Sequence, residues 1–230
     1  MDKNIKIIGL GNKARHGKDT LASILKEKLE GSVVMHFADP LKEEVAQKLA
    51  QPLIFKKHAN GKDYYYLRDH VNTYIMKTAE QMPYLHSIFE KRSIQEYWYM
   101  EEKDSEILQV WGTNFRRQQN PSYWVNKIDR QILNLEFSKD ETKYILLPDT
   151  RFLNEFDFIK SKDGLYIKVV RIDEDGSIFL DTKRDPNHPS ETELDHVDAD
   201  LTFEAKSGDL KALEKAADEV LTYLDYKKGS

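Results

Sequence analysis

The sequence predicts an α/β fold in which a mainly parallel sheet of about five strands lies between layers of helices. Two observations carry this prediction. Short apolar runs recur along the chain at residues 5–9, 33–37, 144–147, 166–172 and, more weakly, 201–203. Stretches with helical spacing separate these runs, and parallel strands need such crossover connections. We therefore expect a three-layer α/β/α protein.

The predicted helices lie at residues 17–30, 40–50, 107–117, 123–137, 154–162 and 210–226. In the last of them, Leu213, Val220 and Leu224 share one stripe, which is typical of a helix that packs on a sheet. A chain of 230 residues is long enough to bury one core, so we expect a single domain over residues 1–230.

One connection is much longer than the others, because residues 51–143 separate the second and third apolar runs. Its first part predicts a β-hairpin with strands at 53–57 and 63–67 around an Asn60-Gly61 turn. We expect a helical and hairpin insert at about residues 51–103. The tyrosines of this insert favour an acceptor pocket and a homodimer interface equally.

Composition narrows the class of protein. No apolar run approaches the roughly 20 residues that span a bilayer, and the N-terminus lacks the order of a secretory signal. The absence of cysteine excludes disulfides and thiolate catalysis. A net charge of -5 gives no global attraction to nucleic acid, which favours a small phosphorylated substrate over a polynucleotide. We expect a soluble cytoplasmic protein with no membrane partner.

The most informative motif is the loop between the first apolar run and the first predicted helix. A loop that ends in Gly-Lys at a helix start directs backbone N–H groups at an anion, and Lys18 adds a charge for nucleotide phosphates. The nucleotide-binding residues predicted here are Asn12, Lys13, Ala14, Arg15, His16, Gly17, Lys18, Asp19 and Thr20. With this loop, the predicted fold is that of a P-loop NTPase; the alternative is an ordinary helix N-terminus.

This loop departs from the usual spacing at two positions. Asn12 stands where a first glycine is expected, but Asn tolerates positive φ and Gly11 lies one residue earlier. Asp19 stands where most such loops carry Ser or Thr for magnesium. Thr20 offers the hydroxyl one residue late, and we expect Asp19 to hold the metal through water.

A second cluster follows the third apolar run. Asp149 ends this strand at the carboxyl edge of the sheet, where ligands of open α/β sheets bind, and Arg151 follows two residues later. We predict that Asp149 joins Asp19 in holding magnesium and that Arg151 neutralises phosphate charge. The alternative is that Asp149 caps the helix that begins near Phe152.

Two further segments are candidates for an acceptor site. Asp39 and Lys42 follow the second apolar run, although Asp39 before Pro40 is also an ordinary helix start. Arg116 and Arg117 lie beside aromatic and amide side chains, a combination that suits a nucleotide. The substrate-binding residues predicted around them are Gln109, Trp111, Thr113 and Trp124. The alternative is a buried tryptophan seam with a solvated basic end.

The polar, proline-rich loop after the fourth apolar run predicts a lid over about residues 173–192. Arg184 in this lid and Arg171 in the strand before it are predicted to contact the nucleotide. His188 is more typical of a surface loop than of a catalyst. Because the histidines are scattered and cysteine is absent, we expect no metal beyond magnesium.

The order of these motifs resembles that of the bacteriophage-type deoxynucleoside monophosphate kinases. The resemblance runs from residue 7 to about residue 224, without the insert. It rests on Gly17-Lys18-Asp19-Thr20, Phe37-Ala38-Asp39-Pro40-Leu41-Lys42, Leu108-Gln109 with Gly112-Thr113, Trp124-Val125, Asp149-Thr150-Arg151-Phe152-Leu153-Asn154-Glu155 and His188-Pro189-Ser190-Glu191.

The resemblance implies that ATP is the phosphate donor and Mg²⁺ the cofactor. Lys18 and the loop amides would bind the donor phosphates, and Asp149 and Arg151 would serve the magnesium and phosphate centre. Arg116 or Arg117 would face the phosphate of the acceptor. If the chain is encoded by a phage, its location would be the host cytoplasm.

Two departures from the family pattern affect these expectations. Asp104-Ser105 stands where the family usually has Pro-Arg, so Arg68 or Arg92 of the insert is expected to substitute for an acceptor arginine. Residues 204–207 replace an Asn-rich turn near the last strand, which leaves the contacts of the donor base open.

The leading hypothesis is an ATP-dependent kinase that converts deoxynucleoside 5′-monophosphates to diphosphates in deoxynucleotide biosynthesis. One alternative is a P-loop kinase with another acceptor, either a hydroxymethylpyrimidine in DNA or a small phosphorylated metabolite. The other is a non-catalytic, nucleotide-gated interaction module, which would need fewer groups tuned to a transition state.

Overall fold

The computed structural model describes residues 5–49, 55–59, 62–66, 108–136, 142–182 and 185–228. The chain divides into two compact units. Unit 1 comprises Met1–Phe37 and Ile128–Ser230, and unit 2 comprises Ala38–Lys127. Within the described ranges, no helix is long and apolar enough to cross a membrane.

Unit 1 is built on a five-stranded sheet in which every strand pair is parallel, as the apolar runs predict. The strand order is β2-β5-β1-β6-β7. The strands are β1 (Ile5–Gly11), β2 (Val33–Val34), β5 (Lys143–Thr150), β6 (Leu165–Ile172) and β7 (Leu201–Lys206). The central strand β1 pairs Ile7 with Ile145 of β5 and Leu10 with Ile167 of β6.

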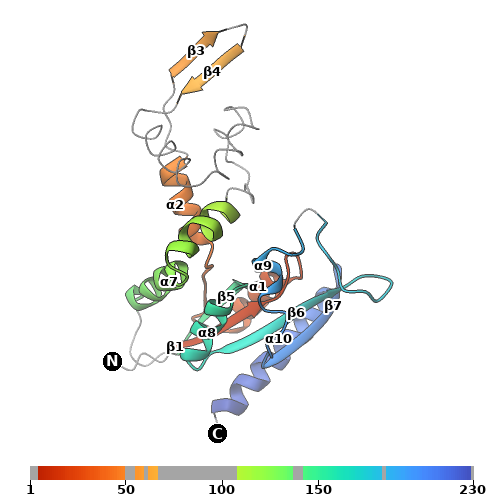
Figure 1. Cartoon of the computed structure of the whole chain (residues 1–230). Coiled ribbons are helices and arrows are strands. Elements are labelled where there is room, and N and C mark those ends of the chain that lie inside the picture. The colour runs from red at the N-terminus through yellow and green to blue at the C-terminus, as the bar shows by residue number, and fades with distance from the viewer. Residues whose placement is uncertain are drawn as a thin grey trace. The chain divides into compact units, whose positions relative to one another are not determined.

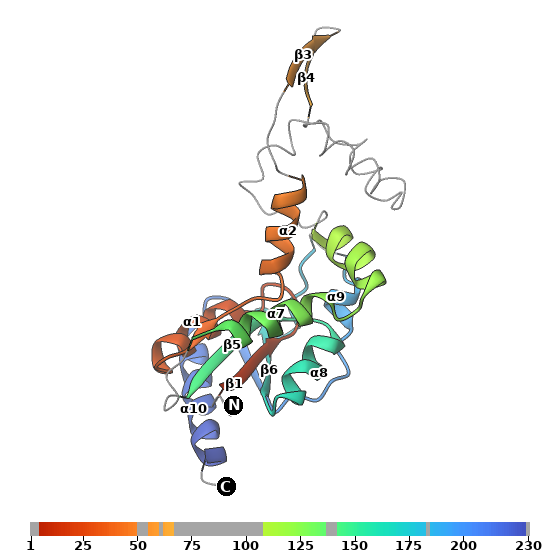
Figure 2. The same cartoon turned by 90° about the vertical axis from the view of Figure 1, so that its left-hand side faces the viewer.

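Helices cover both faces of this sheet. The side chains of Ile8 and Leu10 join one apolar core with α1 (Lys18–Lys28) and α10 (Leu210–Lys228). Gly9 faces the other side, where an added Cβ would lie 2.2 Å from Cδ1 of Ile159 in α8 (Leu153–Ser161). Figures 1 and 2 show α10 and α8 on opposite sides of the sheet. The architecture is therefore a three-layer α/β/α fold that is P-loop-like.

Several predicted boundaries differ from those observed in unit 1; for example, β5 and β7 continue beyond the predicted runs to Thr150 and Lys206. The second strand ends at Val34, not at residue 37. Beyond it, Met35 still donates its N–H to Leu146 O at 2.9 Å, but Phe37 donates to the Asp149 side chain instead of a strand. The first strand is longer than predicted and continues to Gly11.

Unit 2 contains α2 (Asp39–Leu49), a hairpin, a π-helix η1 (Val110–Arg117) and the start of α7 (Tyr123–Asn134). The hairpin strands β3 (Phe55–Ala59) and β4 (Lys62–Tyr66) are antiparallel, with Phe55 opposite Tyr66, which confirms the predicted hairpin. Its predicted turn, Asn60-Gly61, lies outside the described residues, as do residues 67–103 of the predicted insert.

The segment predicted as an ordinary helix at 107–117 is a π-helix from Val110 onward. Gly112 in its first turn packs closely on Leu41 of α2, and Gly112 O accepts a hydrogen bond from Trp124 Nε1 at 3.2 Å. The wider π turn accommodates this packing, which depends on residues distant in sequence.

Candidate functional site

The loop between β1 and α1 adopts the strained backbone that its sequence predicts. Asn12 has φ 108°, Arg15 has φ 60°, and Gly17, the N-cap of α1, has φ 87°. The positive φ expected at Asn12 is therefore confirmed. Gly11 is required for a different reason, because an added Cβ would lie 2.1 Å from the Tyr166 hydroxyl of β6.

Side chains of the loop tie it to the end of β6. Asn12 Nδ2 donates to Val169 O at 2.9 Å, and His16 Nδ1 accepts the N–H of Arg171 at 3.1 Å. The other ring nitrogen, Nε2, therefore carries the proton and donates to Phe179 O at 3.0 Å. Burial lowers the pKa of His16, which keeps this neutral form. The His16 side chain thus holds the loop to the backbone of Arg171 and Phe179.

Lys18 begins α1 directly after this loop and is 4% exposed. Its ammonium group donates to Asn12 O at 3.0 Å and also to Lys13 O. The Lys18 side chain is thus folded back over the loop whose backbone N–H groups would bind a phosphate.

Charges of both signs surround Lys18. Burial, followed by the nearby Arg151 guanidinium, lowers the pKa of Lys18 to about 7. Asp19, Glu191 and Asp149 act in the opposite direction. A bound phosphate would stabilise the charged ammonium and relieve its repulsion from Arg151.

Arg151 is held by a carboxylate that the sequence analysis did not assign to the site. Glu191 Oε1 accepts from Arg151 Nη1 at 2.6 Å, and Glu191 Oε2 accepts from the loop amide of Ala14 at 3.0 Å. Glu191 is 8% exposed and lies within the predicted lid. Two local signals distinguish it from the neighbouring acidic residues: its place in the His188-Pro189-Ser190-Glu191 motif and its position after Pro189 at a helix start.

Asp149 lies near the end of β5, as predicted. Its Oδ1 accepts the N–H of Phe37 at 2.9 Å. The start of α8 is served by Glu155, whose Oε2 accepts from Arg151 N at 2.8 Å and Phe152 N at 3.1 Å. This arrangement assigns the capping of α8 to Glu155 and disfavours the alternative in which Asp149 is its cap.

The second predicted metal ligand, Asp19, is exposed, and its Oδ1 lies 3.4 Å from His36 Nε2. The hydrogen bond with His36 lowers the pKa of Asp19, so this group is a carboxylate near neutral pH. Over the described ranges, no three His, Asp or Glu side chains gather as a metal site. Asp19 and Asp149 fit Mg²⁺ as oxygen ligands only when phosphate and water complete its shell.

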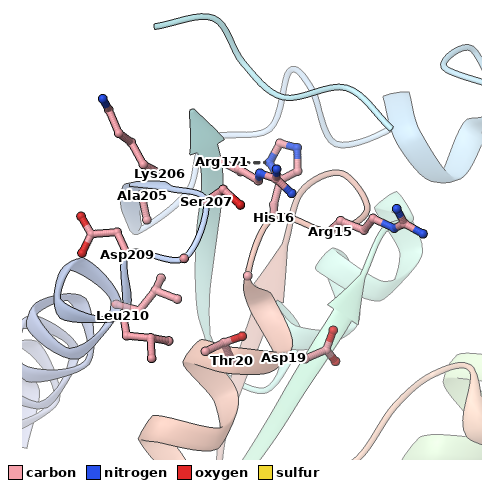
Figure 3. A pocket seen from close by; sticks show the side chains of 13 residues that line it. Arg15, His16, Asp19, Thr20, Arg171, Ala205, Lys206, Ser207, Asp209 and Leu210 are labelled. Atoms are coloured by element: carbon pink, nitrogen blue, oxygen red, sulfur yellow. Dashed lines mark hydrogen bonds between the residues drawn. The ribbon is translucent and has the colours of Figure 1, made fainter. Parts of the chain in front are cut away.

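A cavity of about 300 Å³ lies beside the phosphate loop in unit 1. Its walls are the loop and α1 start at Arg15 and Thr20, Arg171 at the end of β6, and the β7–α10 turn at Ser207 and Asp209. Figure 3 shows these side chains around the cavity, with the Arg171 backbone bonded to His16. The Arg171 guanidinium lies 3.8 Å from the centroid of the Phe179 ring. The turn that departs from the family pattern is therefore a wall of this cavity.

The predicted acceptor residues lie in unit 2, where a buried carboxylate, Glu44, organises several of them. Glu44 accepts from Trp111 Nε1 at 3.0 Å, from Tyr123 OH at 2.6 Å and from Arg116 Nε, and Lys127 Nζ lies 3.4 Å away. Burial alone would raise the pKa of Glu44, but these hydrogen bonds outweigh it and hold the pKa below its usual value. Glu44 was not among the predicted site residues, because this cluster of donors around it, the Glu44 hub, forms only when α2, η1 and α7 pack together.

Trp111 and Trp124, the tryptophans of unit 2 that lie within the described residues, are enclosed. Trp111 is 0% exposed and Trp124 is 1% exposed, and both indole N–H groups are bonded within the unit. This burial favours the tryptophan-seam alternative over base stacking, since an enclosed ring has no face for a ligand. Their contact with substrate stays a prediction.

The remaining acceptor predictions differ in how far the structure describes them. Asp39 and Lys42 form an ion pair at 2.8 Å. Arg117 Nη1 donates to Pro121 O at 3.4 Å, at the end of η1. Gln109 and Thr113 are partly exposed. The predicted residues outside the described part of the chain are Arg68, Arg92 and Arg184.

The fold and this site define a three-layer α/β/α protein with a Gly-Lys loop at the carboxyl end of its central strand. No family model matches the chain. No curated protein matches it significantly. Among solved structures, the chain is similar to TT1252 from Thermus thermophilus at 14% sequence identity and a TM-score of 0.46, over 95% of this chain and 97% of that chain.

Proposed function

We propose that the chain is an ATP-dependent kinase that phosphorylates deoxynucleoside 5′-monophosphates. The observation that carries the donor half of this proposal is the loop itself. Lys18 is buried against loop carbonyls, Arg151 stands beside it, and carboxylates act on both. Phosphoryl transfer depends on positioning and on neutralisation of charge, and this cluster supplies both kinds of group.

In this proposal each group of the loop region has a role. Lys18 and the loop amides bind the donor phosphates, and Arg151 offsets charge on the transferred group. Asp149 and Asp19 would hold Mg²⁺, which would neutralise phosphate charge. The cavity of about 300 Å³ at Arg171 and Ser207 takes the nucleoside of the donor.

The acceptor half rests on the motif resemblance. Arg116, Arg117 and Lys42 are the cations of unit 2 proposed to meet the monophosphate, and Asp39 and Gln109 its sugar or base. Since Arg116 Nε is already bonded to Glu44, only its outer nitrogens would serve a ligand. A small phosphorylated metabolite is the second candidate acceptor, because the same donor machinery would serve it.

A coupled assay of ADP release tests the proposal. The wild-type protein is offered Mg-ATP with each ribo- and deoxynucleoside monophosphate in turn, and with duplex DNA. The proposal expects turnover with at least one deoxynucleotide well above that with its ribonucleotide counterpart. ATP binding without turnover on any acceptor would instead support the non-catalytic module.

A variant pair tests the metal role within the same assay. Asp149→Asn keeps an oxygen that can accept from Phe37 N but loses the charge, so we expect turnover to fall about a hundredfold or more. Asp157→Asn, at an exposed carboxylate on α8, is the matched control and should retain the parental rate. An Asp149→Asn protein with the parental rate and magnesium dependence would remove Asp149 from the site.

A further inference from the structure

The phosphate loop and the arginine that follows β5 are joined by one side chain that neither motif contains. Glu191 Oε1 is bonded to Arg151 Nη1 at 2.6 Å, and its other oxygen, Oε2, to Ala14 N at 3.0 Å. The two partners belong to different parts of unit 1, and the carboxylate side chain between them is 6% exposed. One carboxylate therefore fixes a loop amide and a guanidinium at the same time.

The backbone that carries Glu191 is itself anchored. Glu191 begins the second half of the short helix α9 (Pro189–Thr192), and its carbonyl accepts from Lys13 Nζ at 2.7 Å. Lys13 also pairs with Asp195 at 2.9 Å, and Glu193 accepts the N–H of Leu153 at 2.9 Å. These bonds tie α9 to the phosphate loop on one side and to the start of α8 on the other. The position of the carboxylate is thus set before any ligand arrives.

The charges explain why Arg151 needs such a partner. Arg151 is close enough to Lys18 for the two cations to repel each other. Arg151 is also only 19% exposed, so it cannot gain full hydration in place. Without Glu191, the Arg151 guanidinium would lower its electrostatic repulsion by turning away from Lys18. The bond at 2.6 Å opposes that movement.

We propose that Glu191 is a positioning residue for the phosphate site: it holds Arg151 against the loop so that the guanidinium and Lys18 meet the same terminal phosphate. This inference rests on the proposed function. It predicts that Glu191 acts through Arg151 and not by touching the nucleotide. The alternative role for Glu191 is that of a placeholder, in which its carboxylate occupies the loop in place of phosphate and competes with it.

Side-chain chemistry selects the test variants. Glu191→Gln keeps the shape but places an NH₂ group against either Ala14 N–H or Arg151, both of which are donors. Glu191→Asp keeps the charge but is one methylene shorter, so it reaches only one partner. Glu193→Gln removes the charge of an exposed carboxylate in the same segment but keeps an oxygen that can accept from Leu153 N, so the anchor is retained and the variant serves as the control.

Steady-state kinetics on the full chain provide the first readout. Glu191→Gln should lower kcat roughly 10- to 100-fold, the range for loss of a group that orients another functional group, while the KM of the acceptor changes less than about twofold. Glu191→Asp should fall between this variant and the parent, and Glu193→Gln should match the parent. An unchanged kcat in Glu191→Gln overturns the inference, and so does a rise in ATP affinity, which identifies a competing placeholder.

A double-mutant cycle shows whether the effect passes through Arg151. In an Arg151→Ala background, Glu191→Gln should lower kcat less than about twofold further, because the group it positions is gone. Added guanidinium should partly restore Arg151→Ala and fail to restore the double variant. Fully additive losses, or equal rescue of both proteins, overturn the inference.

An equilibrium measurement keeps this inference separate from the proposed function. The ratio of ATP to ADP affinity, measured calorimetrically with magnesium, reports contact with the terminal phosphate without turnover. Glu191→Gln should lower this ratio several-fold relative to both the parent and Glu193→Gln. If the parent binds ATP but phosphorylates no acceptor, the proposed function fails while the ratio still decides the role of Glu191. An equal ratio in the three proteins, or no ATP binding by the parent, overturns the inference.

Discussion

Each of the two units contains a buried glutamate paired with an arginine, and the two pairs have opposite surroundings. Glu191 pairs with Arg151 in unit 1, and Glu44 pairs with Arg116 in unit 2. The two arginine side chains are almost equally exposed, at 19% and 20%. Exposure alone therefore does not separate a site for a ligand from a structural ion pair.

The two pairs differ in the groups that surround them. Arg116 lies over three aromatic rings, 4.9 to 5.7 Å from their centroids, and Glu44 receives an indole, a phenol and a guanidinium donor. At the loop, the carboxylate of Glu191 stands among Lys18, Arg151 and the backbone amide of Ala14, with no ring over Arg151 among the described contacts. The first pair is closed by its own donors, whereas the second borders a further cation, Lys18, and the loop amide of Ala14.

The largest expected effect comes from breaking the closed pair of Glu44 and Arg116. Glu44→Gln should lower the free energy of unfolding by about 3 kcal/mol, because it leaves a buried guanidinium and an indole N–H without their charged acceptor. Urea denaturation measures this, with Glu43→Gln at the exposed neighbour as the control, expected within about 0.5 kcal/mol of the parent. Equal values for the two variants would show that the hub is not structural.

The sign of its pH dependence follows from the lowered pKa of Glu44. A carboxylate whose folded pKa is depressed stabilises the protein above its unfolded value of about 4.5 and loses this contribution as the pH falls toward the folded value. The difference in stability between the parent and Glu44→Gln should therefore shrink below about pH 4.5. A difference that is constant from pH 7 to pH 3.5 would mean that the charge of Glu44 is not what the hub uses.

The next effect sharpens the comparison, because it separates activity from stability. Lys18→Ala should lower turnover at least about a hundredfold, or roughly 2.7 kcal/mol, since it deletes a charge beside the transferred group. Its melting temperature should stay at or above that of the parent, because folding no longer has to bury an ammonium whose pKa is lowered to about 7.

Lys26→Ala, at an exposed position on the same helix, is the control and should change neither quantity. Thermal melts and ADP release on the same samples give the two readouts. A Lys18→Ala protein that melts like the parent and retains its turnover would show that the loop is not catalytic.

The sequence predicts the site around Lys18 better than it predicts the hub around Glu44. The loop and Lys18 follow β1, and Asp149 lies near the end of β5. The carboxyl ends of parallel strands meet at one edge, so local motifs place these residues together. Even the positive φ of Asn12 follows from its residue type. These features are local, or depend only on the order of strands in the sheet.

The remaining features depend on contacts between distant segments. Glu191 meets the amide of Ala14 across 177 positions of the chain, and Glu44 meets Tyr123 across 79. No spacing within either segment signals the partner. The π-helix at Val110–Arg117 arises in the same way, because Gly112 packs on Leu41 and accepts from Trp124. Local periodicity predicts that this segment is helical but not how wide its turns are.

The smallest expected effect concerns the histidine that holds the open loop. His16 accepts the Arg171 N–H through Nδ1 only while the ring is neutral. Burial has the largest effect on the pKa of His16 and lowers it. The charge of Lys18 also lowers this pKa, whereas that of Glu191 raises it. The unfolded chain therefore binds this proton at a higher pH than the folded chain. Stability should fall as the pH drops below about 6.5, with a slope of at most about 1.4 kcal/mol per pH unit for one proton, and level off below the folded pKa. His16→Gln removes the titrating ring, so urea denaturation from pH 7.5 to 5 should show a shallower slope than in the parent, while His196→Gln at an exposed position keeps the parental slope. Identical slopes in all three proteins would mean that the acid sensitivity of the loop does not arise from His16.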